Sequence, residues 1–472
     1  MPQRKIILFE LNEVPFRIFH DYCEKYPNGN FNVLRRNSSL SNTYSPDIKS
    51  LSPWSTWPTL HRGVDSESHT LTNLSQDLTE IDAEFPPVWK ILNDEGVRIG
   101  LGGSLHTWPP PQDRANYEFY LPDTFATDAS AFPKELKAFQ QFNLAMVDRS
   151  ARNVSRTIPL GSSIKVLGQF PKLGITGSTV TATMRHLLSE IVTPELKNRR
   201  RSIQSMLAFD AFMKQLNRTK PDFCTYFTNH VASAMHRYWA AKYPGDFENN
   251  SYASDWVGQY RNEIDFAMSA ADLFLGRLLN FVDLHREYKL VIVTSMGQAA
   301  FDGTPIHKQV YVKSYDKFLN ALGLNDGEWS RRRVMLPRFA FVVNDAHVQR
   351  IEKLLDTIKI SGSKVAWEKK GSNYFMLHFG QPNLGADQES IVIGEKYYEF
   401  DQVGIENTVI EDSAGSSGYH IPEGLLIVYD PLIPRLSDNS VQISTTEVAP
   451  AILKNFNVRA PAYMPASTSE LV

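Results

Sequence analysis

The chain has 472 residues, of which 42% are hydrophobic, and it carries 49 Lys and Arg against 52 Asp and Glu. This composition is ordinary for a globular protein and argues against a mostly disordered, collagen-like or coiled-coil chain. The net charge of −3 gives no reason to expect nucleic acid or an anionic membrane as the main partner. The two cysteines, Cys23 and Cys224, form neither a disulfide framework nor a cysteine zinc site. No apolar run is long enough for a membrane span, so we expect a cytoplasmic protein.

Five short apolar segments, rich in branched residues, predict strands buried on both faces. They are Lys5–Leu11, Val97–Gly103, Asp222–Asn229, Lys289–Thr294 and Gly424–Tyr429. Near-continuous apolar runs of this length are typical of a parallel sheet.

Helical patterns lie between these segments. Val88–Glu95 carries apolar residues on one side and stops before Gly96, a common residue at a helix C-terminus. Apolar residues recur at spacings of three and four from Ile264 to Val282, which predicts one long amphipathic helix. The alternation predicts an α/β fold: a wound, mostly parallel central sheet with helices on both faces.

Two regions interrupt this rhythm. Residues 1–302 form the first part of the predicted core, with an insertion at about 104–200 that ends in Arg199, Arg200 and Arg201. This arginine triplet fits either a phosphorylated ligand or a solvated helix face. Residues 303–412 predict a small inserted α+β lobe, and residues 413–472 the last part of the core.

Polar residues lie at or after the ends of three predicted strands and before the start of the fifth. Ligands of wound α/β sheets gather at the carboxyl ends of the strands, so these residues are site candidates. They are Glu10 and Asn12 at the end of the first segment, Asn229, His230 and His236 at the end of the third and beyond it, Gln298 after the fourth, and His420 before the fifth.

The segment 50–69 combines hydroxyls, imidazoles and two tryptophans. Ser55 or Thr56 could act as a nucleophile with His61 as its base. Trp54 and Trp57 fit either stacking on a sugar ring or base, or anchoring of the loop in the core.

Read in order, the segments resemble the alkaline phosphatase superfamily, in particular its phosphodiesterase/nucleotide pyrophosphatase branch. The opening is KIILFELNE, which resembles that family's first strand, and WPTLHRGVDSESH is similar to its nucleophile helix. The segments DFCTYFTNHVASAMHRYW, KLVIVTSMGQ and SGYHIPEGLLIVYDP resemble its metal-binding regions. The resemblance implies that His236 and His420 bind metal.

The sequence departs from the family pattern at several functional positions. Asn12 stands at the first metal-binding aspartate, and Ala232 at another. Met296 and Gly297 stand at an Asp-His pair. Pro53 falls at the nucleophile position, so Ser52, Ser55 or Thr56 would have to substitute. The ordinary two-metal mechanism is therefore not expected.

Three functions are considered, of which the third is a metal-free transferase that uses the phosphate pocket of the family to hold a donor. The first is a phosphoester hydrolase, or a phosphoryl or glycosyl transferase, acting on a phosphorylated or nucleotide-linked sugar. It would use Ser55, Thr56, His61 and Glu10 for catalysis. Asn12, Trp54, Trp57, Asn229 and Gln298 would bind substrate, and His230, His236 and His420, with Glu10 available, would hold one divalent ion, Zn or Mn. The FELNE opening also resembles proteins associated with bacterial surface-polysaccharide gene sets. The second is a catalytically silent relative that binds a glycan or a partner protein.

Overall fold

The structure is a computed structural model that describes residues 4–73, 76–149, 168–249, 251–332, 334, 336–433 and 438–467. The chain divides into two compact units. The larger, here the core unit, comprises Met1–Met146, Arg156–Thr304 and Ser416–Val472. The smaller, here the lobe unit, comprises Val147–Ser155 and Pro305–Gly415. The sequence-based range for the lobe is 303–412.

An eight-stranded sheet forms the centre of the core unit in the described part of the chain, with the order β20-β2-β19-β6-β1-β5-β3-β4. Its strands are β1 (Lys5–Leu11), β2 (Ser39–Tyr44), β3 (Ile99–Gly102), β4 (Tyr117–Leu121), β5 (Phe223–Thr228), β6 (Tyr288–Val293), β19 (Glu423–Tyr429) and β20 (Asp438–Ser444). Strands β6, β1, β5, β3 and β4 pair in parallel. The predicted wound, mostly parallel sheet is confirmed.

Four strands differ from the sequence-based expectation, and one of them is β20, which no predicted segment covers. β19 runs antiparallel to both β6 and β2, although its apolar run is typical of a parallel strand. β2 has the polar sequence SLSNTY and carries no apolar signal, yet it is largely buried because it pairs with β19. β4 lies inside the predicted insertion at about 104–200 but forms an edge of the central sheet. Residues 150–167 of that insertion lie outside the described residues.

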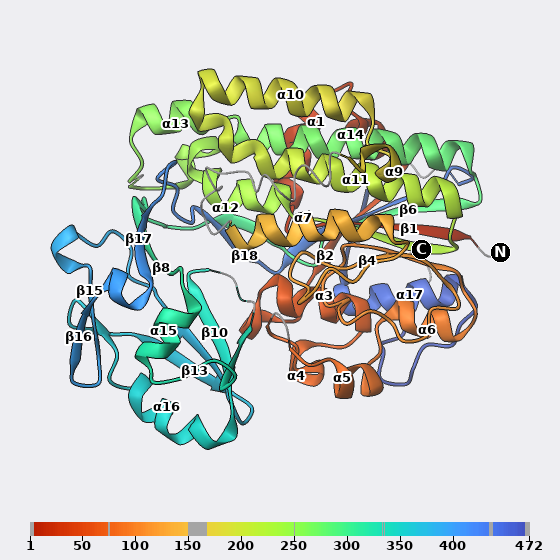
Figure 1. Cartoon of the computed structure of the whole chain (residues 1–472). Helices are drawn as coiled ribbons and strands as arrows, with labels where there is room; N and C mark the ends of the chain where they lie inside the picture. Colours follow the sequence, from red (N-terminus) through yellow and green to blue (C-terminus); the bar gives the residue numbers. More distant parts are fainter. Residues whose placement is uncertain are drawn as a thin grey trace. The chain divides into compact units, whose positions relative to one another are not determined.

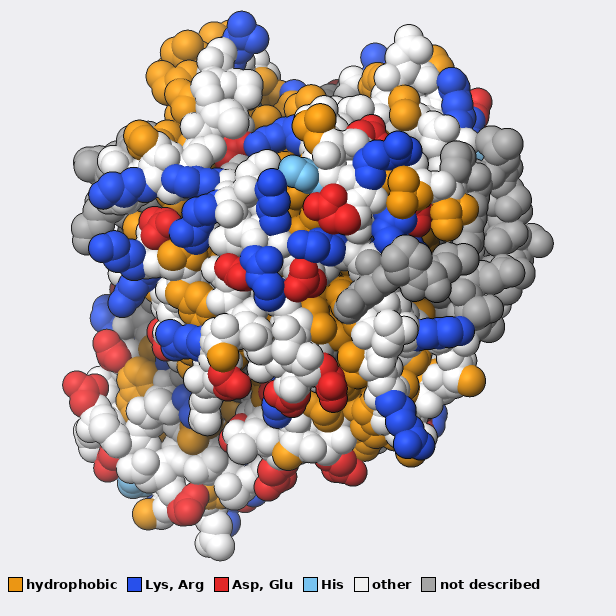
Figure 2. Space-filling model, turned by 90° about the vertical axis from the view of Figure 1, so that its right-hand side faces the viewer, with side chains coloured by type: hydrophobic (Ala, Val, Ile, Leu, Met, Phe, Trp, Pro, Cys, Tyr) orange, Lys and Arg blue, Asp and Glu red, His pale blue; other side chains and the backbone are white. Residues whose placement is uncertain are grey.

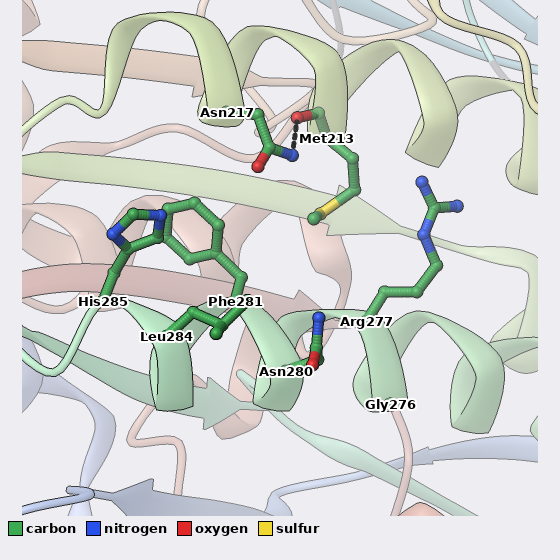
Figure 3. Close-up of a pocket in the computed structure, with 8 residues that line it drawn as sticks. All are labelled: Met213, Asn217, Gly276, Arg277, Asn280, Phe281, Leu284 and His285. Carbon is green, nitrogen blue, oxygen red and sulfur yellow. Dashed lines mark hydrogen bonds between the residues drawn. The ribbon is translucent and has the colours of Figure 1, made fainter.

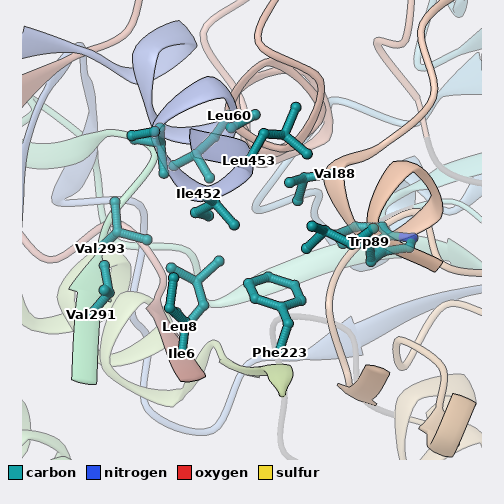
Figure 4. Packing of buried hydrophobic residues seen from close by; sticks show 14 of the residues in the cluster. Ile6, Leu8, Leu60, Val88, Trp89, Phe223, Val291, Val293, Ile452 and Leu453 are labelled. Atoms are coloured by element: carbon teal, nitrogen blue, oxygen red, sulfur yellow. The ribbon is translucent and has the colours of Figure 1, made fainter. Parts of the chain in front are cut away.

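Helices cover both faces of this sheet, as predicted (Figure 1). On one face, α3 (Pro53–Arg62), α6 (Val88–Asp94) and α17 (Val448–Asn455) pack on Ile6 and Leu8 of β1, Phe223 of β5 and Val291 of β6 (Figure 4). On the other face lie α11 (Arg200–Thr219), α12 (His230–Lys242) and α14 (Glu263–Leu284). Successive side chains of a strand point to opposite faces of the sheet, so every second side chain of β1, including Ile6 and Leu8, lies on the face covered by α3.

Further helices flank the core unit. They are α1 (Phe16–Lys25), α2 (Asn30–Asn37), α4 (Ser66–His69), α5 (Thr79–Glu84), α7 (Glu135–Arg149), α9 (Phe170–Leu173), α10 (Gly177–Val192) and α13 (Ser254–Tyr260). A two-stranded sheet of β7 (Gly297–Ala300) and β18 (Gly418–Ile421) follows the carboxyl end of β6.

The lobe unit has its own sheets and its own hydrophobic core. β13 (Ala366–Lys370), β14 (Tyr374–His378), β10 (Arg338–Val343) and β9 (Trp329–Arg332) form one sheet. A second sheet contains β12 (Ser363–Lys364), β11 (Lys359–Ile360), β15 (Ser390–Ile393) and β16 (Lys396–Glu399), while β17 (Ile405–Val409) pairs with β8 (Lys308–Val312). Together with α15 (Tyr315–Ala321) and α16 (Val348–Leu355), they enclose fully buried residues such as Phe341 and Phe375.

The surface agrees with the small net charge. On the face shown in Figure 2, Lys and Arg side chains are interspersed with Asp and Glu side chains. Among the described residues, no helix is long and apolar enough to cross a membrane.

Candidate metal centre

Four segments bring polar side chains together at the carboxyl end of the parallel strands. The turn after β1 supplies Asn12 and Glu13, and α12, which follows β5, supplies His236. β7, which follows β6, supplies Gln298, and β18 supplies His420 opposite it in register. Three neighbouring parallel strands therefore converge on one site, as expected for a wound sheet.

Glu13 is the centre of this cluster. Its Oε2 lies 2.9 Å from His236 Nε2 and 3.4 Å from His420 Nε2. Its other oxygen, Oε1, accepts a hydrogen bond of 2.8 Å from Asn12 Nδ2. Gln298 Nε2 also donates to Oε2. The side chain of Glu13 is 3% exposed, so its charge depends on these partners.

The charges in the cluster are strongly coupled. Burial acts to raise the pKa of the Glu13 carboxyl, but the imidazoles of His420 and His236 outweigh it and hold that pKa well below its usual range. For His420, burial acts to lower the pKa, but the Glu13 carboxylate outweighs it and raises the pKa. The Glu13 carboxylate thus stays ionised despite its burial, because its interactions with the two imidazoles outweigh the cost of burial.

Both histidines are oriented by the backbone. His236 Nδ1 lies 2.8 Å from the Gly418 carbonyl oxygen, and His420 Nδ1 lies 2.9 Å from the Leu51 carbonyl oxygen. A carbonyl only accepts, so each Nδ1 carries a proton and each Nε2 points to Glu13. Metal-binding histidines commonly have Nδ1–H bonded to a carbonyl in this way, and an ion at this site would take the place of the Nε2 contacts with Glu13.

The cluster fits a single divalent ion. The ligand atoms of Glu13, His236 and His420 all lie within 4.8 Å of one another. Ligands of a common zinc ion are about 2.1 Å from it and hence within about 4 Å of one another. Two imidazoles and one carboxylate are a ligand set of catalytic zinc, which leaves a fourth position open. Only small side-chain shifts would bring the three ligands onto one ion.

Glu10 and His61, which the sequence analysis assigned to catalysis, form a separate buried pair. Glu10 lies within β1 opposite Phe227 and Val293, so its side chain leaves the sheet on the α3 face rather than at the strand end. His61 Nε2 contacts Glu10 Oε1 at 2.8 Å, and both side chains are at most 2% exposed. Neither contacts a hydroxyl of Ser55 or Thr56 in the described hydrogen bonds.

His230, assigned to the metal, also lies apart from the Glu13 cluster. It begins α12, where Nδ1 accepts from the Thr228 hydroxyl at 2.7 Å and Nε2–H donates to the Ala267 carbonyl at 3.0 Å. Burial lowers its pKa to about 4. Both ring nitrogens are used within the fold, so His230 has no nitrogen left for an ion.

The predicted nucleophiles Ser55 and Thr56 are fully buried in the first turn of α3. The Ser55 hydroxyl donates to backbone carbonyls of Ser50 and Ser52. The Thr56 hydroxyl contacts the Ser52 carbonyl and Ser295 Oγ at 2.8 Å. Ser52, at the N-cap of α3, is partly exposed and directly follows Leu51, whose carbonyl meets His420.

The tryptophans divide between two environments. Trp57 is fully buried, with its ring 5.5 Å from that of His61 and 5.6 Å from that of Phe227, so it cannot stack on a ligand. Trp54 is partly buried and packs edge-on against Phe125. The interpretation of Trp57 as a core anchor is the one that the structure supports.

Sequence reasoning missed three residues of the site. Glu13 was part of the quoted strand end but was not assigned a role, although it is the one acidic residue directly after β1. Tyr419 and Phe301 are each 47% exposed, and their rings lie 5.1 Å apart. Tyr419 also stacks on His420, with 4.5 Å between ring centroids. Two exposed aromatic rings therefore border the histidines.

The arginine triplet is engaged within the protein. Arg199 pairs with Glu263 at 2.6 Å, Arg200 pairs with Glu190, and Arg201 bonds to Ser233. These contacts leave little basis for a phosphate site at the triplet.

A surface pocket of about 390 Å³ lies elsewhere in the core unit. Its walls come from α11 and the end of α14, and they are Met213, Asn217, Gly276, Arg277, Asn280, Phe281, Leu284 and His285 (Figure 3). α14 leads into the start of β6, so this pocket is at the opposite end of the parallel strands from Glu13.

The fold and this site define a wound α/β protein with a Glu-His-His cluster at its strand ends. No protein-family model matches the chain, and no curated protein matches it. Solved structures similar over the whole chain include the alkaline phosphatase PafA, with 12% identity, TM-score 0.45 and coverage of 100% of this chain and 99% of that chain. They also include murine ectonucleotide pyrophosphatase/phosphodiesterase 5 in complex with AMP, with 10% identity, TM-score 0.41 and coverage of 99% and 98%. The chemistry of this chain must be argued from its own side chains.

Proposed function

We propose that this protein is a phosphoester hydrolase, or a related phosphoryl or glycosyl transferase, with a single divalent ion at Glu13, His236 and His420. The observation that carries the proposal is that the Nε2 atoms of His236 and His420 both point to Glu13 Oε2. The Nδ1–H of each ring is hydrogen-bonded to a backbone carbonyl oxygen. A bound Zn or Mn ion would act as a Lewis acid toward a phosphoryl oxygen.

The surrounding groups suit a phosphorylated ligand. Asn229 is exposed, and its Oδ1 accepts from Asn12 Nδ2 at 2.7 Å, which turns its NH2 group outward to donate to a phosphoryl or hydroxyl oxygen. Ser52 is the partly exposed hydroxyl at the start of α3, beside the carbonyl that orients His420. We therefore propose Ser52, rather than the buried Ser55 and Thr56, as the hydroxyl available for attack.

A sugar-linked substrate is supported by the aromatic border of the site. The exposed rings of Tyr419 and Phe301 provide apolar faces on which a sugar or a base can stack. A phosphorylated or nucleotide-linked sugar has both an anionic group for the ion and a ring for these faces. The FELNE resemblance adds bacterial surface-polysaccharide metabolism as the proposed context, with the protein in the cytoplasm.

A second candidate is a catalytically silent protein that binds a glycan or a partner. Two observations favour it: Ser55 and Thr56 are buried and bonded to the backbone, and the fully buried Met296 stands where the related enzymes have a metal ligand. It predicts a binding site without turnover.

Metal content and turnover of matched variants test the proposal. We expect about one transition-metal ion per wild-type chain by mass spectrometry, and hydrolysis of an aryl phosphodiester or of a nucleotide sugar. Glu13→Gln removes one ligand charge while keeping the side-chain shape, so the ion and the turnover should both be lost. Ser52→Ala should keep the ion and lose turnover.

The control is His230→Gln, which should keep both ion and turnover because His230 lies outside the cluster. A metal-free wild-type protein without turnover would contradict the enzyme and favour the silent binder. Product that forms only when an acceptor sugar is added would assign transfer rather than hydrolysis.

A further inference from the structure

The Asn12 side chain connects the metal centre to the buried core. Asn12 Oδ1 accepts from the Trp57 indole N–H at 2.7 Å. Asn12 Nδ2 donates to Glu13 Oε1 at 2.8 Å and to Asn229 Oδ1 at 2.7 Å. The amide is 1% exposed, so water cannot readily replace these partners.

Trp57 decides which way this amide points. An indole N–H only donates, whereas the facing oxygens of Glu13 and Asn229 only accept. A rotation of the Asn12 amide by 180° would place its NH2 against the indole N–H and its oxygen against both other oxygens. All three hydrogen bonds would be lost at once. The indole therefore selects the orientation that presents the NH2 group to Glu13.

This orientation matters because side-chain contacts hold both carboxyl oxygens of Glu13. Its backbone has φ of 60°, in the left-handed region that non-glycine residues rarely adopt. Oε1 is held by Asn12, while Oε2 meets His236, His420 and Gln298. Without the Asn12 bond, Oε1 loses this partner, and the orientation of the carboxyl depends on the contacts of Oε2 with His236, His420 and Gln298.

Trp57 is itself fixed by the core. It is fully buried, and the His61 ring stacks on it with 5.5 Å between centroids. His61 is held in turn by Glu10 at 2.8 Å and by the edge of Trp89 at 4.6 Å. The position of the indole nitrogen is thus set by the packing between α3, α6 and β1.

We infer that Trp57 is a positioning residue of the metal centre, acting through Asn12 on Glu13, and that the Glu10–His61 pair supports Trp57 from the core. The inference rests on the proposed metal site. It gives Trp57, His61 and Glu10 a common role away from the substrate. Groups bonded directly to a metal ligand, as Asn12 is to Glu13, typically contribute about 10- to 100-fold to metal affinity, and the loss of Trp57 acts on that contribution.

The test is Zn²⁺ binding by Trp57→Phe, which keeps an aromatic ring against His61 but removes the indole N–H. We expect its dissociation constant for Zn²⁺ to be about 10- to 100-fold larger than that of wild type, as measured by competition with a chromophoric chelator. Trp54→Phe is the matched control, since Trp54 lies on the same helix and packs on Phe125 instead. Its affinity should equal that of wild type.

The effect of Trp57 on Glu13 through Asn12 is here called the relay. A double-mutant cycle distinguishes the relay from a general destabilisation of the fold. If Trp57 acts through Asn12, Trp57→Phe should cause no further loss in the Asn12→Ala background. Additive losses, or an unchanged affinity in Trp57→Phe, would overturn the inference. Thermal unfolding of each metal-free variant confirms that the proteins compared are folded.

A measurement on the metal-free protein tests the relay independently of the proposed function. In the metal-free protein, Trp57→Phe should move the NMR signals of the His236 and His420 rings, because both contact Glu13, whereas Trp54→Phe should leave them in place. If wild type binds no Zn²⁺, the metal proposal fails, and these ring signals alone decide the relay. Unmoved signals would show that Trp57 does not position Glu13.

Discussion

Of the two carboxyl groups at the end of β1, only that of Glu13 reaches the site, because Glu10 lies within the strand and Glu13 lies after it. Glu10 and Glu13 are three residues apart and both buried. Glu10 belongs to β1, where the alternation of side chains directs it into the face covered by α3. Glu13 follows the strand in a turn with φ of 60°, which carries it past the sheet edge toward His236 and His420. Residue type alone does not distinguish the two.

His230 gives a residue-scale prediction about pH. Its pKa is about 4 in the folded protein, because of burial, against about 6.5 for an exposed histidine. The unfolded chain therefore binds a proton as pH falls through 6.5, while the folded protein does not until about pH 4. The stability linked to neutral His230 is fully present above pH 6.5 and is lost as pH falls toward 4. The free energy of unfolding should fall by about 3 kcal/mol over this range from this one group.

The variant His230→Gln should remove this loss. We expect its free energy of unfolding to fall less between pH 6.5 and 4 than that of wild type, as measured by urea denaturation at several pH values. An equally steep fall would mean that His230 is not held neutral by the fold.

At the scale of elements, helix α3 is fixed at both ends. Ser52 caps its start, accepting from Trp54 N–H at 3.2 Å, and Gly63 ends it with φ of 64°. A Cβ at Gly63 would lie 3.0 Å from Met464 Cγ and 3.2 Å from the Thr446 carbonyl oxygen. The helix that carries Trp57 therefore ends where only glycine fits both the backbone angle and the space.

Two glycine variants separate these effects. Gly96, which ends the turn after α6, has φ of 79°, and no described atom lies within 4 Å of the place that a Cβ would take. Gly96→Ala should cost about 1 kcal/mol of unfolding free energy, from the backbone angle alone. Gly63→Ala should cost about 2–3 kcal/mol, because the methyl group also crowds the chain near its end. Equal losses in denaturant titrations would show that the space around Gly63 adjusts.

At the scale of the whole molecule, the two units have separate cores, and every ligand of the proposed metal centre belongs to the core unit. Phe341 of the lobe unit is fully buried among aromatic and aliphatic side chains. Phe341→Ala should destabilise the lobe unit by about 3–5 kcal/mol through the cavity it leaves. Zn²⁺ affinity should stay that of wild type.

Calorimetry with and without Zn²⁺ checks this expectation. The transition lowered by Phe341→Ala should differ from the one that Zn²⁺ raises, since ligand binding stabilises only the structure that holds it. A single transition shifted by both changes would show that the units unfold together.

Much of the fold could be predicted from the sequence. The apolar runs of β1, β5 and β6 were identified to within a residue or so, because strands buried on both faces need continuous apolar side chains. β2 was missed because its burial comes from pairing with β19 and not from apolar side chains of its own. The direction of β19 was also not encoded locally, since an apolar run is the same whichever way it runs.

For the site, the sequence by itself determined that polar and ionisable residues follow the buried strands, and that His236 and His420 belong among them. That much follows from the ends of apolar runs, because parallel strands deliver their carboxyl ends to one edge. Only the tertiary structure decided which of these groups meet. It put Glu13 rather than Glu10 beside the histidines, satisfied His230 with Thr228 and Ala267, and buried Ser55, Thr56 and Trp57. The physical reason is that contact partners depend on strand register, on one left-handed turn and on helix packing, none of which a local pattern specifies.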